Sequence, residues 1–191
     1  MPKLAKTSIP VHEFIAERWS PRSFDDAAVL EHEQLIAMLE AARWAPSALN
    51  LQPWRFAVAL RGTELFEALH DTLAPGNQAW AHRASALMVC AADTLRPNGE
   101  PNGTAHYDLG LAVSLLTVQA HAMDLHVHQM GGFNRGAASA LLQLPDSVVP
   151  VVILAIGTLG DPELLGDGPL REREMSVRER KPLEEIVLTG L

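Results

Sequence analysis

Two groups of cationic side chains lie near opposite ends of the sequence. Arg18, Ser20 and Arg22 alternate with other residues early in the chain, and Arg178 and Arg180 belong to a basic run near its end. Arginine offers a fork of N–H donors that suits phosphate, and a serine hydroxyl adds a short neutral donor. Both groups are therefore candidates for holding one small anion. A solvated helix face with glutamate partners, or an exposed helix end with an N-cap serine, is the competing interpretation.

A second candidate is the run PSALNLQPW at residues 46–54, between a predicted helix and a predicted strand. Prolines favour an extended loop, in which Ser47 and Asn50 can present polar groups to a ligand while Trp54 packs into the core. A loop with a purely structural role is the alternative.

Other chemical motifs are weak in this sequence. There is no Walker phosphate loop, Rossmann glycine fingerprint, HExxH or paired CxxC. His126 and His128 stand two apart without a completing ligand set, so we expect histidines of the core or the surface and no metal site. Cys90 is the single cysteine and lies among apolar residues, which favours a packing role over a nucleophilic one.

Composition limits the class of protein. A chain of 191 residues with 48% hydrophobic residues fits one globular domain, 1–191. The formal net charge of −8 argues against a nucleic-acid partner. No signal-like segment and no long uninterrupted apolar stretch is present, so we expect a cytoplasmic protein that does not bind membranes.

Hydrophobic periodicity places these candidates on an α+β sandwich of interleaved helices and strands. The segment 107–125 is apolar on every side and predicts a long, buried central helix. Its surplus of apolar surface indicates two-fold packing between chains, with complete burial inside a monomer as the alternative. The remaining expected elements are helices at 11–19, 30–44, 62–72 and 136–144 and strands at 55–60, 86–92, 148–156 and 186–188.

Three segments carry a resemblance to one family. RWSPRSF at residues 18–24, APSALNLQPWRF at 45–56 and RERKPLEEIV at 178–187 are similar to motifs of the nitroreductase family, and the resemblance extends from Phe14 to Val187. It implies a nitroreductase-like fold with a central mixed or antiparallel sheet, flanking helices and a C-terminal extension. It also implies a homodimer with FMN at the subunit interface. The loop at residues 46–50 of one subunit would cover the flavin that Arg18 and Arg22 of the other subunit hold.

Carried over to this sequence, the resemblance assigns phosphate contacts to the two cationic groups and to Ser20. Asn77 would bond the pyrimidine edge of the flavin, unless it is only a turn residue, and the amides of Gly131 and Gly132 would lie near N5 and O4. Ala48 replaces a serine of the family, and Gly131 stands where some relatives carry an acid. The implied cofactor-binding residues are Arg18, Trp19, Ser20, Arg22, Pro46, Ser47, Ala48, Asn50, Asn77, Gln129, Gly131, Gly132, Arg178 and Arg180.

The implied activity is a ping-pong cycle in which NADH or NADPH passes hydride to flavin N5 and a nitroaromatic, a quinone or a similar small acceptor is then reduced. No side chain is required as acid or base. Arg22 is a candidate for placing positive charge near flavin N1 and O2, or else for serving the phosphate. The alternatives are an FMN storage or sensor module without turnover, and a specialised member such as a dehalogenase or a flavin-fragmenting enzyme.

Overall fold

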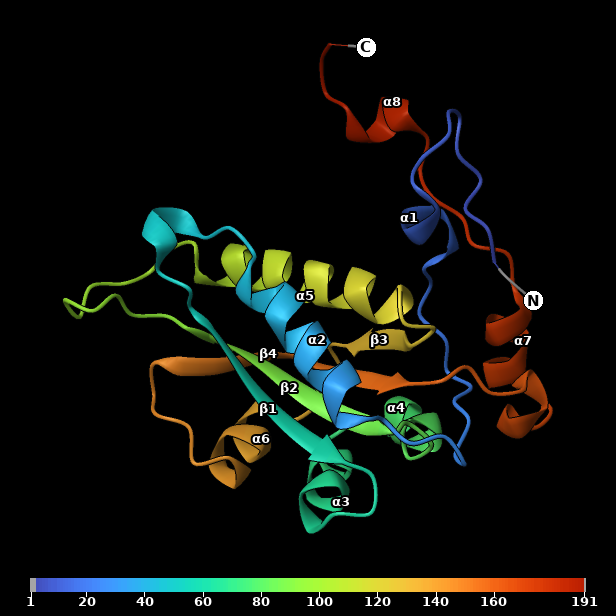
Figure 1. Cartoon of the computed structure of the whole chain (residues 1–191), viewed down its shortest axis with the longest axis horizontal. Helices are drawn as coiled ribbons and strands as arrows, with labels where there is room; N and C mark the ends of the chain where they lie inside the picture. The colour runs from blue at the N-terminus through green and yellow to red at the C-terminus, as the bar shows by residue number, and fades with distance from the viewer. Residues whose placement is uncertain (1–2, 191) are drawn as a thin grey trace.

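A four-stranded antiparallel sheet forms the centre of the protein (Figure 1). The computed structural model describes residues 3–190. The strand order is β1-β2-β4-β3, so that β1 and β3 are the two edges. The expected α+β fold is confirmed, and every strand pair is antiparallel. The strands are β1 Trp54–Leu60, β2 Ala86–Asp93, β3 His126–Met130 and β4 Val148–Gly157.

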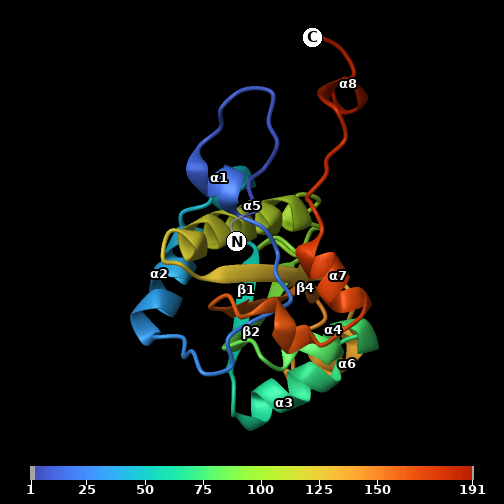
Figure 2. The same cartoon turned by 90° about the vertical axis from the view of Figure 1, so that its right-hand side faces the viewer.

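Helices cover both faces of the sheet (Figures 1 and 2). α2 and α5 pack on one face, and α3, α4 and α6 lie on the other. The helices are α1 Glu13–Glu17, α2 His32–Arg43, α3 Glu64–Asp71, α4 Pro75–Ala81, α5 Ala105–His121, α6 Arg135–Leu141, α7 Pro169–Met175 and α8 Leu183–Ile186, with 3₁₀ turns η1 Ala48–Asn50 and η2 Pro162–Leu165.

Local sequence sets where several of these helices begin. The Thr63 side chain accepts a hydrogen bond from Phe66 N at 3.3 Å and caps α3. Asn134 caps α6 in the same way through Ala137 N at 3.0 Å. Such caps satisfy N–H groups that the first turn of a helix leaves without partners.

The middle strand β2 explains why the core has two halves. Its residues are buried from Ala86 to Ala92, as expected for a strand covered on both faces. Met88 and Cys90 point to the layer of α2 and α5, and Leu87 and Val89 point to the layer of α3 and α4. Burial raises the pKa of the Cys90 thiol, which agrees with the packing role expected for it.

Helix α5 has one buried face and one exposed face. Leu109, Leu116 and Ala120 are fully buried against the sheet and α2. Tyr107 and Leu115 keep 70% and 40% of their surface exposed. The alternative of a central helix completely buried inside one chain is therefore wrong, because a single sheet face covers only one side of a helix.

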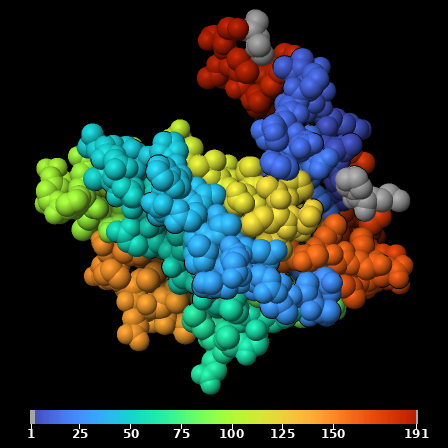
Figure 3. All heavy atoms as spheres, viewed as in Figure 1, coloured from blue at the N-terminus to red at the C-terminus, as the bar shows by residue number. Residues whose placement is uncertain are grey.

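The strand expected at 186–188 is also wrong. Residues 183–186 form the short helix α8, and Ile186 and Leu188 are exposed. Figures 1, 2 and 3 show the reason, since the C-terminal arm leaves the body beside the N-terminal segment and reaches no sheet edge. β-branched residues alone do not make a strand without a neighbour to pair with.

Apart from α8 and the two 3₁₀ turns, three further elements were not expected from the sequence. Helix α4 starts at Pro75, which is followed by a glycine. A Pro-Gly pair is typical of turns, but proline is also common at the first position of a helix. Strand β3 is short and mixes polar with apolar residues, and α7 lies in the arginine-rich segment. None of the helices within residues 3–190 is long and apolar enough to cross a bilayer.

Candidate functional site

The first part of the site is the loop between α1 and α2. Arg18 ends α1, and its Nη1 donates to Ser20 Oγ at 3.4 Å. The Ser20 hydroxyl donates to Gln129 Oε1 at 3.3 Å, and Gln129 Nε2 donates to Thr117 Oγ1 at 3.0 Å. Three segments distant in sequence, the loop, β3 and α5, are thus connected by side-chain hydrogen bonds.

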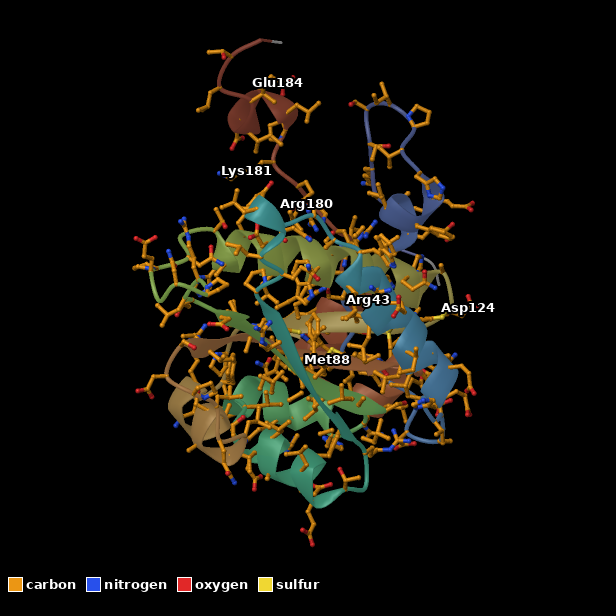
Figure 4. All side chains as sticks on the ribbon, turned by 60° about the vertical axis from the view of Figure 1, so that its left-hand side comes forward. Arg43, Met88, Asp124, Arg180, Lys181 and Glu184 are labelled. Carbon is orange, nitrogen blue, oxygen red and sulfur yellow. The ribbon has the colours of Figure 1, made fainter. Side chains whose placement is uncertain are left out.

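The C-terminal cations join this loop. The Arg178 guanidinium donates to the carbonyl oxygens of Arg18 and Ala16. Burial lowers the pKa of Arg18, and the charges of Arg178 and Arg180 lower it further. Arg180 itself is exposed, on the segment that leads to α8 (Figure 4). The two cationic groups of the sequence therefore lie together.

These cations lack anionic partners among the residues that the structure describes. Across residues 3–190, Arg18, Arg22, Arg178 and Arg180 form no salt bridge with a carboxylate. The buried Nε of Arg178 has no hydrogen-bond partner there either. Gathering half-buried like charges is unfavourable unless an anion offsets them. The donor set fits a phosphate monoester, which is the terminal group of FMN.

A second part of the site follows β3 directly. The carbonyl oxygen of Gly132 accepts hydrogen bonds from Ala74 N at 2.9 Å and from Asn77 Nδ2 at 3.0 Å. A Cβ on Gly132 would lie 3.2 Å from Asn77 Nδ2, so a side chain there would crowd the contact. Gly131 is exposed with open space around it. The turn interpretation of Asn77 is wrong, because this residue is the third of helix α4.

Arg22 and two histidines of β3, His126 and His128, lie next to the first part of the site. His128 Nδ1 donates to the carbonyl oxygen of Pro21 at 2.8 Å, which fixes the proton on Nδ1. Burial above all lowers the pKa of His128 to about 4, and the charge of Arg22 adds to the effect. Burial and the neighbouring His121 lower the pKa of His126 to about 4. Both are neutral packing histidines at pH 7.

Trp19 belongs to the same region but is buried. Its ring lies against that of His126, with centroids 6.4 Å apart, and Lys3 Nζ sits 4.3 Å from its centroid. In the part of the chain that the structure describes, no three His, Cys, Asp or Glu side chains are grouped so that they could hold a metal.

The Pro46–Asn50 loop lies elsewhere. Ala48 N donates to Asp108 Oδ2 at 3.3 Å, at the first turn of α5, and Gln52 N donates to Ser47 Oγ at 3.0 Å. Pro46 and Asn50 are exposed. Leu49 and Asn50 have φ values of 52° and 55°, in the left-handed region that side chains disfavour.

This loop enters β1, the edge strand opposite β3. Along α5, Asp108 and Thr117 are nine residues apart, or about 13 Å. In Figure 1 the loop lies at the far left of α5, whereas α1 and α7 lie at the right. Within one chain, the structure therefore brings together Arg18, Ser20, Gln129 and Arg178 but does not bring the loop to them.

Sequence reasoning missed two residues of this site. Thr117 orients Gln129 from inside α5, and Glu174 of α7 contacts the backbone of Arg22. The available signal for Glu174 was an acid in the run REREM at residues 171–175, but its pattern indicates an ordinary ion-pair partner of the neighbouring arginines.

The fold and the site define a class: an α+β sandwich with a cluster of cationic side chains at one sheet edge and a glycine-containing segment directly after β3. The chain belongs to the nitroreductase family. The model of that family, described as "Nitroreductase family", matches residues 15–158. The match ends before Arg178, so the C-terminal cations lie outside it.

Individual relatives agree with this assignment. The fold is similar to a solved structure of an oxidoreductase containing FMN, with a TM-score of 0.89, 36% identity and coverage of 97% of this chain and 94% of that one. A candidate nitroreductase from Desulfovibrio desulfuricans, solved in complex with FMN, has a TM-score of 0.74, 25% identity and coverage of 97% and 99%. YdgI of Bacillus subtilis, named as a candidate NAD(P)H nitroreductase, is 27% identical over 78% of this chain and 88% of its own.

Proposed function

We propose that this protein is an FMN-dependent oxidoreductase that uses NADH or NADPH to reduce small electron-poor acceptors such as nitroaromatics or quinones. Family membership and the two FMN-containing relatives support the proposal. When bound, FMN supplies the redox chemistry by accepting hydride and passing electrons on in a ping-pong cycle. The protein supplies binding, orientation and electrostatics.

The observation that carries the proposal is the cation cluster without anionic partners. Arg18, Ser20, Arg178 and Arg180 would hold the FMN phosphate. Gln129 fixes the Ser20 hydroxyl from β3. One phosphate at this position fits FMN better than FAD, whose phosphates continue into a second nucleotide.

The glycine segment would receive the flavin ring. Gly131 and Gly132 are exposed and allow a close approach of ligand to backbone. Asn77 is fixed beside them by its bond to Gly132 O. Arg22 would place positive charge near flavin N1 and O2, where reduction builds negative charge, and no side chain acts as acid or base.

The proposed active unit is a homodimer. Pro46, Ser47, Ala48 and Asn50 would come from the partner chain, because in their own chain they lie at the opposite sheet edge. The exposed face of α5 around Tyr107 and Leu115 would be covered by the two-fold contact. The C-terminal arm exposes further apolar side chains at Leu183, Ile186 and Leu188, which contact with a second chain would also bury.

The test begins with the absorption spectrum of the purified protein and identification of the released flavin. We expect FMN, and we expect rapid reduction by NADH or NADPH in a stopped-flow experiment, followed by reoxidation with a nitroaromatic or a quinone. Recovery of FAD, or no flavin after reconstitution, contradicts the proposal. FMN that stays oxidised with both nicotinamides identifies a storage or sensor module instead.

A further inference from the structure

A single buried acid fastens the N-terminal cation loop to the C-terminal part of the chain. Glu174 of α7 is 1% exposed. Its Oε2 accepts the Arg22 N–H at 2.9 Å, and its Oε1 accepts the Ser23 N–H at 3.1 Å. Each carboxylate oxygen therefore binds one of two successive backbone amides. A buried carboxylate is costly unless such hydrogen bonds satisfy it.

The charges around Glu174 are cationic. Burial lowers the pKa of Lys3, and the charges of Arg22 and Arg178 lower it further. The nearby Glu174 charge acts in the opposite direction and raises it. Within residues 3–190, the Glu174 carboxylate nevertheless forms no salt bridge with Arg22 or Arg178. Its oxygens bind backbone amides, so the Glu174 carboxylate does not occupy either guanidinium group.

Neighbouring contacts fix the same loop. Ser23 O accepts Gly160 N at 3.0 Å, and the Ser23 hydroxyl donates to Asp161 O. A Cβ on Gly160 would lie 2.6 Å from the Phe24 carbonyl carbon, so the two segments touch along their backbones. Glu174 adds a connection that these contacts lack. It belongs to the helix that leads within four residues to Arg178, and so it couples the Arg22 backbone to the C-terminal cations.

We propose that Glu174 is a positioning residue for the phosphate end of the flavin site. It holds Arg18, Ser20 and Arg22 in register with Arg178 before the ligand arrives. This inference rests on the proposed function. Because Glu174 acts on the loop that carries the phosphate contacts, its loss weakens binding of a flavin that has a phosphate far more than binding of one that lacks it.

The experiment compares Glu174→Gln with Glu172→Gln, an exposed acid on the same helix that gives the same change in charge. Dissociation constants for FMN and riboflavin are measured by quenching of flavin fluorescence. The glutamine keeps the volume and one acceptor oxygen but loses the second. We expect the preference for FMN over riboflavin to fall about tenfold in Glu174→Gln. Glu172→Gln should keep the wild-type preference.

An unchanged preference in a folded Glu174→Gln variant overturns the inference, as does an equal loss for both flavins. If the wild-type protein binds no FMN, the proposed function itself fails, and the two failures are distinguishable. If Glu174→Gln does not fold, the inference is tested by amide hydrogen exchange of residues 18–25 in flavin-free wild-type protein. The loop is expected to be protected before FMN is added, and free exchange there overturns the inference.

Discussion

The two parts of the proposed flavin site differ in how firmly their own chain holds them. Residues 18–25 are fixed by contacts from three segments: His128 and Gln129 of β3, Gly160 after β4, and Glu174 of α7. The Pro46–Asn50 loop has one hydrogen bond to another element, from Ala48 to Asp108, and exposes Pro46 and Asn50. It also contains successive residues with positive φ.

The difference indicates a division of tasks. A loop fixed from all sides can present charged groups without reorganisation when the anion binds. Strained and exposed backbone persists only where surroundings determine it, and for the Pro46–Asn50 loop those surroundings would be the second chain with its flavin. In the proposed dimer, the first region would be complete within a subunit, and the second would become complete only through the other chain.

The strongest test of this division is complementation in mixed dimers. One chain carries Arg18→Ala with Arg22→Ala, and the other carries Asn50→Ala with Ser47→Phe. Each homodimer should be nearly inactive. In the mixed dimer both sets of defects fall on one site, so activity should return to about half per dimer. Differently tagged chains allow the mixed dimer to be isolated and assayed. Mixed dimers that recover nothing, or a monomer that retains FMN, contradict the shared site.

A large effect is also expected from the C-terminal cations. Arg178→Ala together with Arg180→Ala should weaken FMN binding by roughly 3 kcal/mol, since hydrogen bonds to charged groups contribute about 1.5–3 kcal/mol each. Arg178→Ala alone should cause most of the loss, because Arg178 lies beside Arg18 whereas Arg180 is exposed. Titration with FMN at low salt gives the dissociation constant of each variant. Arg173→Ala, an exposed cation of α7, is the control and should leave the affinity unchanged.

The fixed region should also carry a pH dependence that the loop region lacks. The pKa of His128 is lowered from 6.5 to about 4, so between these values the unfolded chain binds more protons than the folded one. This contribution to stability is complete above pH 6.5 and is lost as the pH falls toward 4. His128→Asn keeps a donor for Pro21 O but does not titrate. It should reduce the loss of unfolding free energy over that range by about 3 kcal/mol.

Denaturant unfolding at several pH values between 4 and 7 measures this difference. His106→Asn replaces an exposed histidine of α5 and should leave the pH dependence as in the wild type. Equal slopes for His128→Asn and the wild-type protein would show that this histidine is not held neutral by burial.

The smallest expected effect concerns the loop. Ala48→Ser restores a hydroxyl at the position where the family carries serine, and one neutral hydrogen bond contributes about 1 kcal/mol. FMN binding should tighten by that amount, with the FMN dissociation constant as the measurement. Ala122→Ser, at an exposed position at the end of α5, should change nothing. An effect present only in dimeric protein would place Ala48 at the flavin of the other chain.

Sequence alone determined most of the elements and the family. Helices 30–44 and 62–72 and strands 55–60, 86–92 and 148–156 agree with α2, α3, β1, β2 and β4 to within a few residues, because hydrophobic period and caps are local properties. Local pattern failed for 186–188, where no partner strand exists, and for β3, whose mixed residues become a strand only through pairing with β4.

The tertiary structure supplied the contacts between the candidate residues within one chain. The sequence marks Arg18, Arg178 and Asn50 as ligand contacts, and only the family resemblance implies that the two arginines share one phosphate. The fold brings Arg178 against the Arg18 carbonyl across 160 positions and leaves Asn50 at the opposite sheet edge. It also buries Glu174 under the Arg22 backbone, where its neighbours in sequence suggest a surface ion pair. Strand order and helix docking set these distances, and both depend on long-range packing that local spacing does not encode.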